Sequence, residues 1–405
     1  MLNVLLVTPI VNVSASALDL TQYVNPFIAT HYRQAEPSAV VPFGMISAGP
    51  TTSGNTMYQY DNTTITGFAF EPDVYTSLAG FMPVTNSITI SPKEDRAYYS
   101  SAYSHSNESA SPGYYQVLLQ DSNTNVELTV TKRTAMTKVT YPSGSTPKML
   151  IYANAQGNTR TGEINIDVAN KKVYGHIVRS STLTQYFVMY FDTAFTKYGT
   201  WNGTSLSDDS TYSSGDVGAY VEFGSTNLQM KTAISFVSLA NAELNLSAEN
   251  PNWDFVATRT AAEDEWNTIL NRIQVTSNGK SDDIDKFYSF LYVALKNPHT
   301  LNDVNGEYPG YDGSIYTASN YTKYYNLPGW DMYRSTISLV SLVAPSVTED
   351  IAKSILSFYE QAGGFFTYGS YNGCSFARNL RKICTKFAKF LKFVLREKCE
   401  IFICI

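Results

Sequence analysis

The feature that most constrains the fold of this 405-residue chain is a change in the spacing of its apolar residues near Asn250. From about Leu18 to Leu246, β-branched and aromatic residues alternate with polar ones in short runs, separated by Gly, Pro, Asn and Ser clusters. Beyond that point, apolar residues recur with the spacing of helices. We therefore expect an α+β multidomain protein, with an antiparallel β-sandwich over residues 18–250 followed by helices.

Individual elements can be predicted from the same patterns. The clearest strand-like runs in the first part are Ser87–Ile90, Gln116–Leu119, Glu127–Val130, Lys172–Val178, Gln185–Phe191 and Ala219–Phe223. No helix is expected between Leu18 and Leu246. In the second part, helices are predicted over Trp253–Ile273, Asp282–Leu295, Met332–Ala344 and Val347–Gln361. Gly363 and Gly364 act as the stop of the last helix.

The helical part is interpreted as incomplete. Residues 251–280 form a helical linker, and residues 281–373 form the first part of a helical domain. Helical hairpins need neighbours to bury their remaining apolar faces, and few helices are available here.

The last 32 residues, 374–405, differ in chemistry from the rest of the chain. They contain eight Lys and Arg, two Glu and all four cysteines, a net charge of +6 against −12 for residues 1–373. Apolar residues from Phe376 to Val394 form a helical stripe beside basic ones, which suits an anionic membrane or a partner's groove. The alternative is a non-native tail appended to a truncated protein, and the abrupt change in composition favours it. Membrane contact is expected only if the tail is genuine.

The N-terminus carries features of a secreted protein. Residues 1–17 contain an apolar run and the small-x-small pattern Ala15-Ser16-Ala17, although Pro9 interrupts the run and no basic residue precedes it. We expect a signal peptide and an extracellular location. Five Asn-x-Ser/Thr glycosylation sequons give weaker support, at Asn62, Asn107, Asn202, Asn245 and Asn320.

Composition and motifs exclude several functions. No run of about eighteen uncharged apolar residues predicts a spanning helix, and a pI near 5.3 argues against nucleic-acid binding. The four histidines show no metal-binding spacing, so no metal ligand is assigned. A nucleophile elbow, a phosphate loop and a dinucleotide fingerprint are all missing from the sequence.

Two segments combine carboxylates with aromatic residues. Asn302–Asp312 contains Asp303 and Glu307 among Gly, Pro and Tyr, while Trp330 and Asp331 precede a predicted helix. An Asp in that position is either a helix cap or a sugar-binding group. An indole packs on the apolar face of a sugar, and a neighbouring carboxylate accepts hydrogen bonds from its hydroxyls. The residues by themselves therefore indicate a carbohydrate site as one of two interpretations.

A series of short phrases across residues 22–373 resembles glycoside hydrolase family 92, the exo-acting, calcium-dependent α-mannosidases. In chain order the phrases are Val24–Ile28, Val40–Met45, Pro112–Tyr115, Glu127–Thr129, Gly218–Val221, Ala233–Ser238, Asp303–Gly306, Tyr308–Gly310 and Trp330–Arg334. Two stretches depart from the family, which has His-rich or Gly-rich loops where this chain reads Gly67–Pro72 and Ala29–Arg33. The family's sugar contact therefore does not carry over to Gly67–Pro72.

The resemblance implies a β-sandwich packed on an (α/α)₆ barrel, of which this chain holds an incomplete part. It implies inverting hydrolysis of terminal α-mannose from glycans, with one carboxylic acid protonating the leaving oxygen and another carboxylate activating water. It also implies Ca²⁺ as cofactor and Trp330, Asp331 and Arg334 as substrate-binding residues, Arg334 bracing the loop.

The resemblance assigns no catalytic acid, base or metal ligand to this chain, because the family's corresponding residues lie further along the barrel than Gly373. The first hypothesis is therefore an inactive, truncated glycosidase. The alternatives are a mannoside-binding module that does not cleave, and a peripheral protein anchored through residues 374–405.

Overall fold

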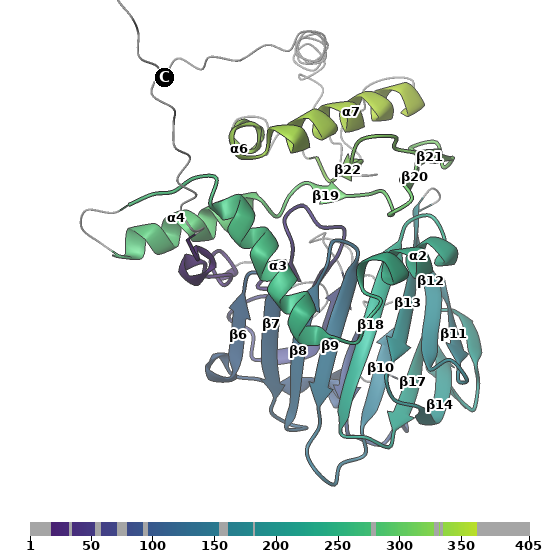
Figure 1. Cartoon of the computed structure of the whole chain (residues 1–405). Helices are drawn as coiled ribbons and strands as arrows, with labels where there is room; N and C mark the ends of the chain where they lie inside the picture. Colours follow the sequence, from purple (N-terminus) through teal and green to yellow (C-terminus); the bar gives the residue numbers. More distant parts are fainter. Residues whose placement is uncertain are drawn as a thin grey trace, which may run out of the picture.

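The computed structural model of the chain describes residues 18–31, 35–52, 58–70, 79–91, 96–153, 161–180, 183–276, 281–327, 332 and 335–362. Within these ranges two antiparallel sheets lie face to face, and most of the helices gather at one end of them (Figure 1). None of the helices within the described residues is long and apolar enough to cross a membrane.

The two sheets contain nine strands each among the described residues. The first sheet has the order β1-β2-β3-β4-β10-β17-β14-β15, with β5 paired to β3. Its strands are β1 (Ala39–Val40), β2 (Ser47–Thr52), β3 (Thr64–Phe70), β4 (Gly80–Val84), β5 (Ser101–Ala102), β10 (Lys148–Tyr152), β14 (Phe195–Asn202), β15 (Ser205–Asp208) and β17 (Val217–Phe223). The second sheet has the order β16-β11-β12-β13-β18-β9-β8-β7-β6. Its strands are β6 (Glu108–Ser111), β7 (Tyr114–Leu119), β8 (Thr124–Val130), β9 (Thr134–Thr140), β11 (Gly162–Asp167), β12 (Lys172–Ser180), β13 (Leu183–Phe191), β16 (Tyr212–Gly215) and β18 (Asn227–Ser235).

The main hydrophobic core lies between the two sheets. Strand β7 shows why, because Tyr115, Val117 and Leu119 point inward and are fully buried, while the intervening Gln116 and Leu118 are only half-buried. Residues from both sheets join one cluster of buried side chains. The period-two pattern in the sequence therefore becomes the inner face of an antiparallel sandwich.

Most strand predictions are confirmed. The runs beginning at Gln116, Glu127, Lys172, Gln185 and Ala219 lie in β7, β8, β12, β13 and β17. The prediction for Ser87–Ile90 is wrong, because these residues form no strand. The carbonyl of Ile90 instead accepts a 2.6 Å hydrogen bond from the Tyr99 hydroxyl, so a side chain takes the place of a strand partner.

The expectation of no helix before Leu246 is also wrong. Helix α2 (Leu239–Glu249) begins after Ser238, whose hydroxyl accepts a hydrogen bond from the amide of Asn241. Ala242 and Leu246 are buried against Val188 and Ala233 on the outer face of the second sheet. Packing on a sheet stabilises this short helix, although its polar composition makes its helical periodicity weak. A four-residue helix, α1 (Arg96–Tyr99), also lies in this part of the chain.

The helices predicted in the second part are present. They are α3 (Phe255–Leu270), α4 (Ser281–Ala294), α6 (Thr336–Val343) and α7 (Pro345–Ala362). The Asp254 side chain caps α3 by accepting from the amide of Ala257. Two short ladders lie between α4 and α6: β19 (His299–Thr300) pairs with β22 (Tyr324–Tyr325), and β20 (Glu307–Pro309) pairs with β21 (Ile315–Thr317).

A second core joins the helices to the start of the sandwich. Trp266 of α3 is fully buried, and its indole N–H donates to the carbonyl of Val40 in β1. Tyr292 of α4 lies against the same indole, with ring centroids 4.3 Å apart. Residues 18–25 run along these helices, where the amide of Asn25 donates to the Ser289 hydroxyl. The helices are therefore fixed to the sandwich by specific contacts.

Gly113, in the turn between β6 and β7, marks a close approach between sandwich and helix. Its φ is +80°, and a Cβ at this position would lie 2.6 Å from the Cβ of Ala262 in α3. Gly144 has the same φ but nothing within 4 Å of its Cβ position. We expect Gly113→Ala to lower the free energy of unfolding by about 1–3 kcal/mol more than Gly144→Ala does. An alanine is strained at the positive φ of either position, but only at position 113 would its methyl group overlap α3. Urea unfolding of the two variants measures the difference, and equal losses would contradict the close approach.

Candidate active-site region at the sandwich–helix junction

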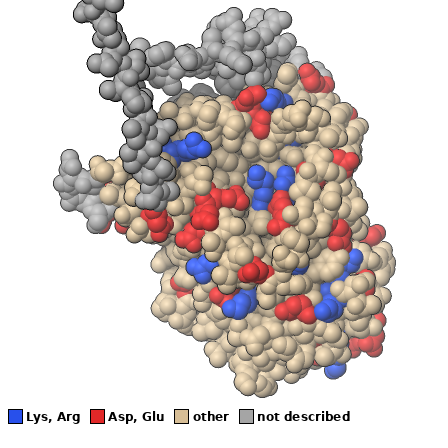
Figure 2. All heavy atoms as spheres, in the orientation of Figure 1, with Lys and Arg blue, Asp and Glu red and all other residues tan. Residues whose placement is uncertain are grey.

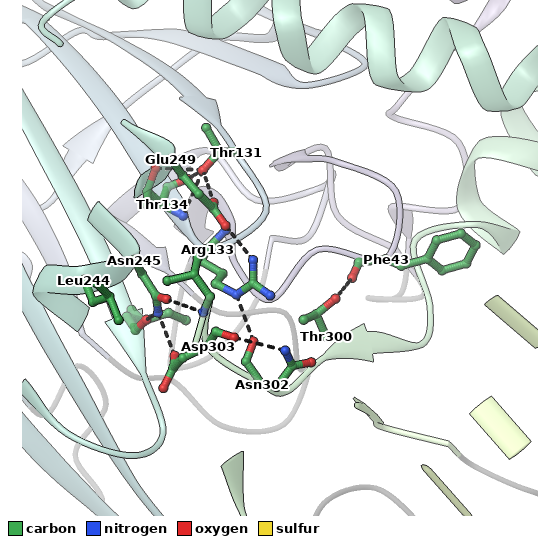
Figure 3. Close-up of polar contacts among 12 residues, drawn as sticks. Phe43, Thr131, Arg133, Thr134, Leu244, Asn245, Glu249, Thr300, Asn302 and Asp303 are labelled. Atoms are coloured by element: carbon green, nitrogen blue, oxygen red, sulfur yellow. Dashed lines mark hydrogen bonds and ion pairs between the residues drawn. The ribbon is translucent and has the colours of Figure 1, made fainter. Parts of the chain in front are cut away.

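The segment that joins α4 to β20 is held against the start of the sandwich. The carbonyl of Phe43 accepts hydrogen bonds from the backbone amide of Thr300, at 3.0 Å, and from its hydroxyl, at 2.8 Å (Figure 3). The Nδ1 of His299 donates to the carbonyl of Gly44. Phe43 adopts a positive φ of 57°, which turns its carbonyl toward β19. The junction therefore brings together residues separated by more than 250 positions in the sequence.

Asp303 is the centre of a buried hydrogen-bond network at this junction. Its carboxylate accepts from the Ser235 hydroxyl at 2.6 Å, from the Asn241 amide at 2.8 Å and from the Asn245 amide at 2.6 Å. Figure 3 shows Asn245 of α2 reaching this carboxylate. Burial raises the pKa of Asp303, while these three hydrogen bonds and the nearby Arg133 guanidinium oppose that shift. The network fastens the loop before β20 to α2 and to the end of β18.

The other two carboxylates of the Asn302–Asp312 segment have different surroundings. Glu307 accepts from the side-chain amides of Asn241, at 2.9 Å, and Asn305, at 3.0 Å. Asp312 is exposed and accepts from the Ser314 amide and the Tyr316 hydroxyl, which closes the turn between β20 and β21. Each carboxylate thus has a local structural role in the described geometry.

Arg133 joins the turn between β8 and β9 to both the end of α2 and the junction. Its guanidinium contacts the Glu249 carboxylate at 2.6 Å and donates to the carbonyl of Asn302 at 2.8 Å (Figure 3). Glu249 also accepts from the Thr131 hydroxyl and from the backbone amide of Arg133. This ion pair was not found by sequence reasoning, because its partners lie 116 residues apart and neither belongs to a recognisable phrase.

Two family models match consecutive stretches of this chain. Residues 23–235 match the glycosyl hydrolase family 92 N-terminal domain, and residues 241–378 match the glycosyl hydrolase family 92 catalytic domain. The chain belongs to glycosyl hydrolase family 92. This confirms the resemblance that the short phrases indicated, and the antiparallel sandwich followed by helices agrees with the order of the two family domains.

Solved structures of the family overlay on the chain. An inverting family 92 mannosidase from Bacteroides thetaiotaomicron VPI-5482 superimposes with a TM-score of 0.79 at 26 % identity, over 89 % of this chain and 52 % of that protein. A family 92 α-mannosidase from Bacteroides thetaiotaomicron in complex with mannoimidazole superimposes with a TM-score of 0.80 at 27 % identity, over 88 % of this chain and 51 % of that protein. A curated relative, described as an uncharacterized secreted glycosidase from Arthroderma benhamiae, is 25 % identical over 72 % of this chain and 43 % of its own length. The chain thus spans about half the length of these relatives.

The substrate-binding residues expected from the sequence, Trp330, Asp331 and Arg334, lie outside the described residues. Their described neighbours Leu327 and Met332 are buried in the second core, in one cluster with Phe43 and Tyr324. The assignment of the three residues therefore stays a prediction. The predicted signal peptide over residues 1–17 and the basic tail over residues 374–405 also lie outside the described part of the chain.

The calcium ion that the resemblance implies finds no ligand set in the described ranges. Across those residues, no group of three or more His, Cys, Asp and Glu side chains could hold a metal ion. The junction carboxylates are engaged with side-chain amides, hydroxyls and Arg133. We therefore assign no calcium ligand among the described residues.

Lys296, just beyond α4, is a buried cation at this junction and is expected to make folding stability depend on pH. Its ammonium donates to the carbonyl of Glu36 at 2.8 Å and lies 5.6 Å from the centroid of the Tyr292 ring. Burial lowers the pKa of Lys296 from 10.5 to about 8, with the Glu36 carboxylate acting in the opposite direction. A lysine with a lowered pKa destabilises the fold while it is charged, because the unfolded chain holds the same proton more tightly.

We therefore expect the Lys296 contribution to stability to increase as the pH rises from about 8 towards 10.5. Relative to Lys296→Met, the wild-type chain should gain on the order of 2 kcal/mol of unfolding free energy over this interval. Urea unfolding of both proteins between pH 7.5 and 10 measures the difference between their free energies of unfolding. Groups that titrate equally in both proteins do not contribute to this difference. A difference that stays constant across this range would contradict the shifted pKa.

Proposed function

We propose that this chain is part of an inverting α-mannosidase that releases terminal α-linked mannose from mannose-containing glycans. The observation that carries the proposal is the ordered match to both family 92 domains over residues 23–235 and 241–378. Similarity to an inverting mannosidase, and to an α-mannosidase in complex with mannoimidazole, supports mannose as the sugar. The chain covers only about half of these relatives, so the activity belongs to the proposal for the whole protein.

The proposed architecture assigns residues 18–250 to the sandwich, 251–280 to a helical linker and 281–373 to the first part of an (α/α)₆ barrel. The hairpin of α6 and α7 beyond α4 supports a helical domain built from paired helices. Phe290 on α4 and Leu342 on α6 expose large apolar side chains, which further barrel helices would bury.

Within this architecture, Trp330, Asp331 and Arg334 are the proposed contacts to the terminal mannose. The Trp330 indole would pack on the apolar face of the sugar, and the Asp331 carboxylate would accept hydrogen bonds from ring hydroxyls. Arg334 would brace the loop that carries both.

For the 405 residues by themselves, we propose mannoside binding without hydrolysis. Inverting hydrolysis needs a carboxylic acid and a carboxylate placed on opposite faces of the sugar. The carboxylates at the described junction, Asp303, Glu307 and Glu249, are each engaged in structural hydrogen bonds. Loss of acid–base assistance costs roughly 10²–10⁴-fold in rate for each group.

An extracellular location completes the proposal. The signal-peptide features of residues 1–17 and four of the five sequons support it, since Asn245 is fully buried and hydrogen-bonded to Asp303, and one relative is described as a secreted glycosidase. Treatment of the protein, expressed in a eukaryotic secretory host, with an N-glycan-cleaving amidase tests this. A mass decrease supports secretion through that route, whereas retention of an uncleaved and unglycosylated chain in the cells contradicts it.

The function is tested by incubating the full chain with methyl α-mannoside, methyl α-glucoside and 4-nitrophenyl α-mannoside. We expect binding of the mannoside in preference to the glucoside by calorimetry, loss of that binding in Asp331→Ala, and no release of 4-nitrophenol. Equal binding of the two methyl glycosides would contradict mannose specificity. Release of 4-nitrophenol would contradict the absence of hydrolysis. Proton NMR would then assign the stereochemistry, since β-mannose as first product agrees with inversion and α-mannose contradicts it.

A further inference from the structure

A cavity lies on the outer face of the second sheet, on the side of α2 opposite to the Asp303 network. Its volume is about 320 Å³, and its walls come from β13, β18, α2 and the link between α2 and α3. Helical geometry separates the two sides, because Asn241 and Asn245 face Asp303 whereas Glu243 and Ser247 lie roughly half a turn away. The volume is at the lower end of the range for small-molecule sites, which is about 300–1,000 Å³.

Trp253 provides an aromatic wall, and the Lys231 ammonium lies against its ring. The Lys231 ammonium lies 4.5 Å from the centroid of its ring and donates to the carbonyls of Asn250, at 3.1 Å, and Pro251, at 3.0 Å. The link that carries Trp253 is therefore tied to β18. Although Lys231 is buried, Trp253 keeps 38 % of its surface exposed. A ring that is held in place yet open to solvent loses little entropy when a ligand packs on it.

Polar groups face the same cavity beside the indole. The Glu243 carboxylate accepts from the Tyr190 hydroxyl, at 2.9 Å, and from the Lys172 ammonium, at 3.1 Å, while its side chain stays 35 % exposed. Carboxylate oxygens have about four lone-pair directions, so Glu243 retains acceptor capacity toward the solvent. The exposed Ser247 hydroxyl donates to the carbonyl of Leu244 and can still accept a hydrogen bond.

The charges of the cavity balance one another. Lys172 neutralises Glu243, and Lys231 is turned toward backbone carbonyls and an indole face. Basic and acidic side chains are likewise interspersed over the face drawn in Figure 2, on which α2 and the start of α3 lie. This arrangement suits a neutral ligand with hydroxyl groups better than an ion.

We propose that this cavity binds one pyranose unit of a glycan, as a carbohydrate-binding site separate from the junction around Asp303. The Trp253 indole takes the apolar C–H face of the ring, and Glu243 accepts hydrogen bonds from its hydroxyls. The cavity holds a single ring, so the site is weak for free sugars. It binds polymeric glycans more tightly than free sugars, because the many sugar units of one polymer raise the effective concentration of sugar at the site. The proposal does not depend on mannosidase activity.

Affinity electrophoresis of the full chain in gels containing α-mannan or β-glucan tests the proposal. We expect retardation by at least one polysaccharide, with an apparent dissociation constant at least about tenfold higher in Trp253→Ala. Ser247→Arg places a long side chain over the cavity at the cost of one small hydroxyl, and it should weaken retardation similarly. The matched control is Tyr212→Ala, which removes an exposed aromatic residue of β16 and should leave retardation unchanged.

The outcomes also separate this site from the proposed mannose contacts. Loss of retardation in Trp253→Ala and Ser247→Arg, with methyl α-mannoside binding intact, supports the cavity whether or not the mannosidase proposal holds. Retardation that survives both substitutions, or that Asp331→Ala abolishes alone, overturns it. A wild-type chain that neither polysaccharide retards also overturns it. Circular dichroism melting of each variant shows whether the fold is retained, and Glu243→Gln replaces any variant that fails to fold.

Discussion

Replacing Trp266 with alanine is expected to lower the free energy of unfolding by about 4–5 kcal/mol, a loss typical of a large aromatic residue removed from a packed core. The indole is fully buried and contacts Tyr292 of α4. Its N–H donates to the carbonyl of Val40, which would be left without this donor in an apolar environment. Both effects act at the interface between helices and sandwich, so the helices should lose their attachment first. Urea unfolding followed by far-ultraviolet circular dichroism measures the loss.

Two further variants separate the contributions. Trp266→Phe keeps an aromatic ring in the core but removes the N–H donor. This variant should therefore be about 1–3 kcal/mol less stable than the wild-type chain. Trp253→Ala removes an indole that is 38 % exposed and should cost less than Trp266→Ala. A loss for Trp266→Ala as small as that expected of a half-exposed residue would contradict the role of Trp266 in the second core.

Replacing Asp303 with alanine is expected to cost roughly 3–5 kcal/mol, because three buried donors lose their common acceptor at once. Those donors are the Ser235 hydroxyl and the side-chain amides of Asn241 and Asn245. Asp303→Asn keeps the volume and one acceptor oxygen, but its amide nitrogen must face another donor. We expect the asparagine variant to lose about half as much, again measured by urea unfolding.

The matched control for Asp303 is Asp312→Ala in the same segment. Asp312 is exposed and accepts only from its own turn, at Ser314 and Tyr316, so we expect a loss within about 1 kcal/mol. Equal losses in Asp303→Ala and Asp312→Ala would show that the buried network does not hold the loop. A large loss at Asp303 alone would show that it does.

Local periodicity accounts for the parts of the fold that could be predicted. The alternation in β7 and β13 and the helical spacing in α3 and α4 arise from residues close together in the chain, which contact the same core. Helix α2 was missed because its stability comes from packing on the second sheet. Ser87–Ile90 has the composition of a strand, but the Tyr99 hydroxyl donates a hydrogen bond to the carbonyl of Ile90, where a neighbouring strand would have donated a backbone amide.

By itself, the sequence determined the order of sandwich and helices and, through short phrases in a fixed order, the family. Only the tertiary structure decided how the two parts are joined. Trp266 meets Val40 across 226 positions, Arg133 meets Glu249 across 116, and Asn241 meets Asp303 across 62. The same holds for the cavity beside Trp253, whose walls come from two strands, a helix and a link. Such contacts leave no local pattern, because a side chain's partner is set by where the backbone brings distant segments together.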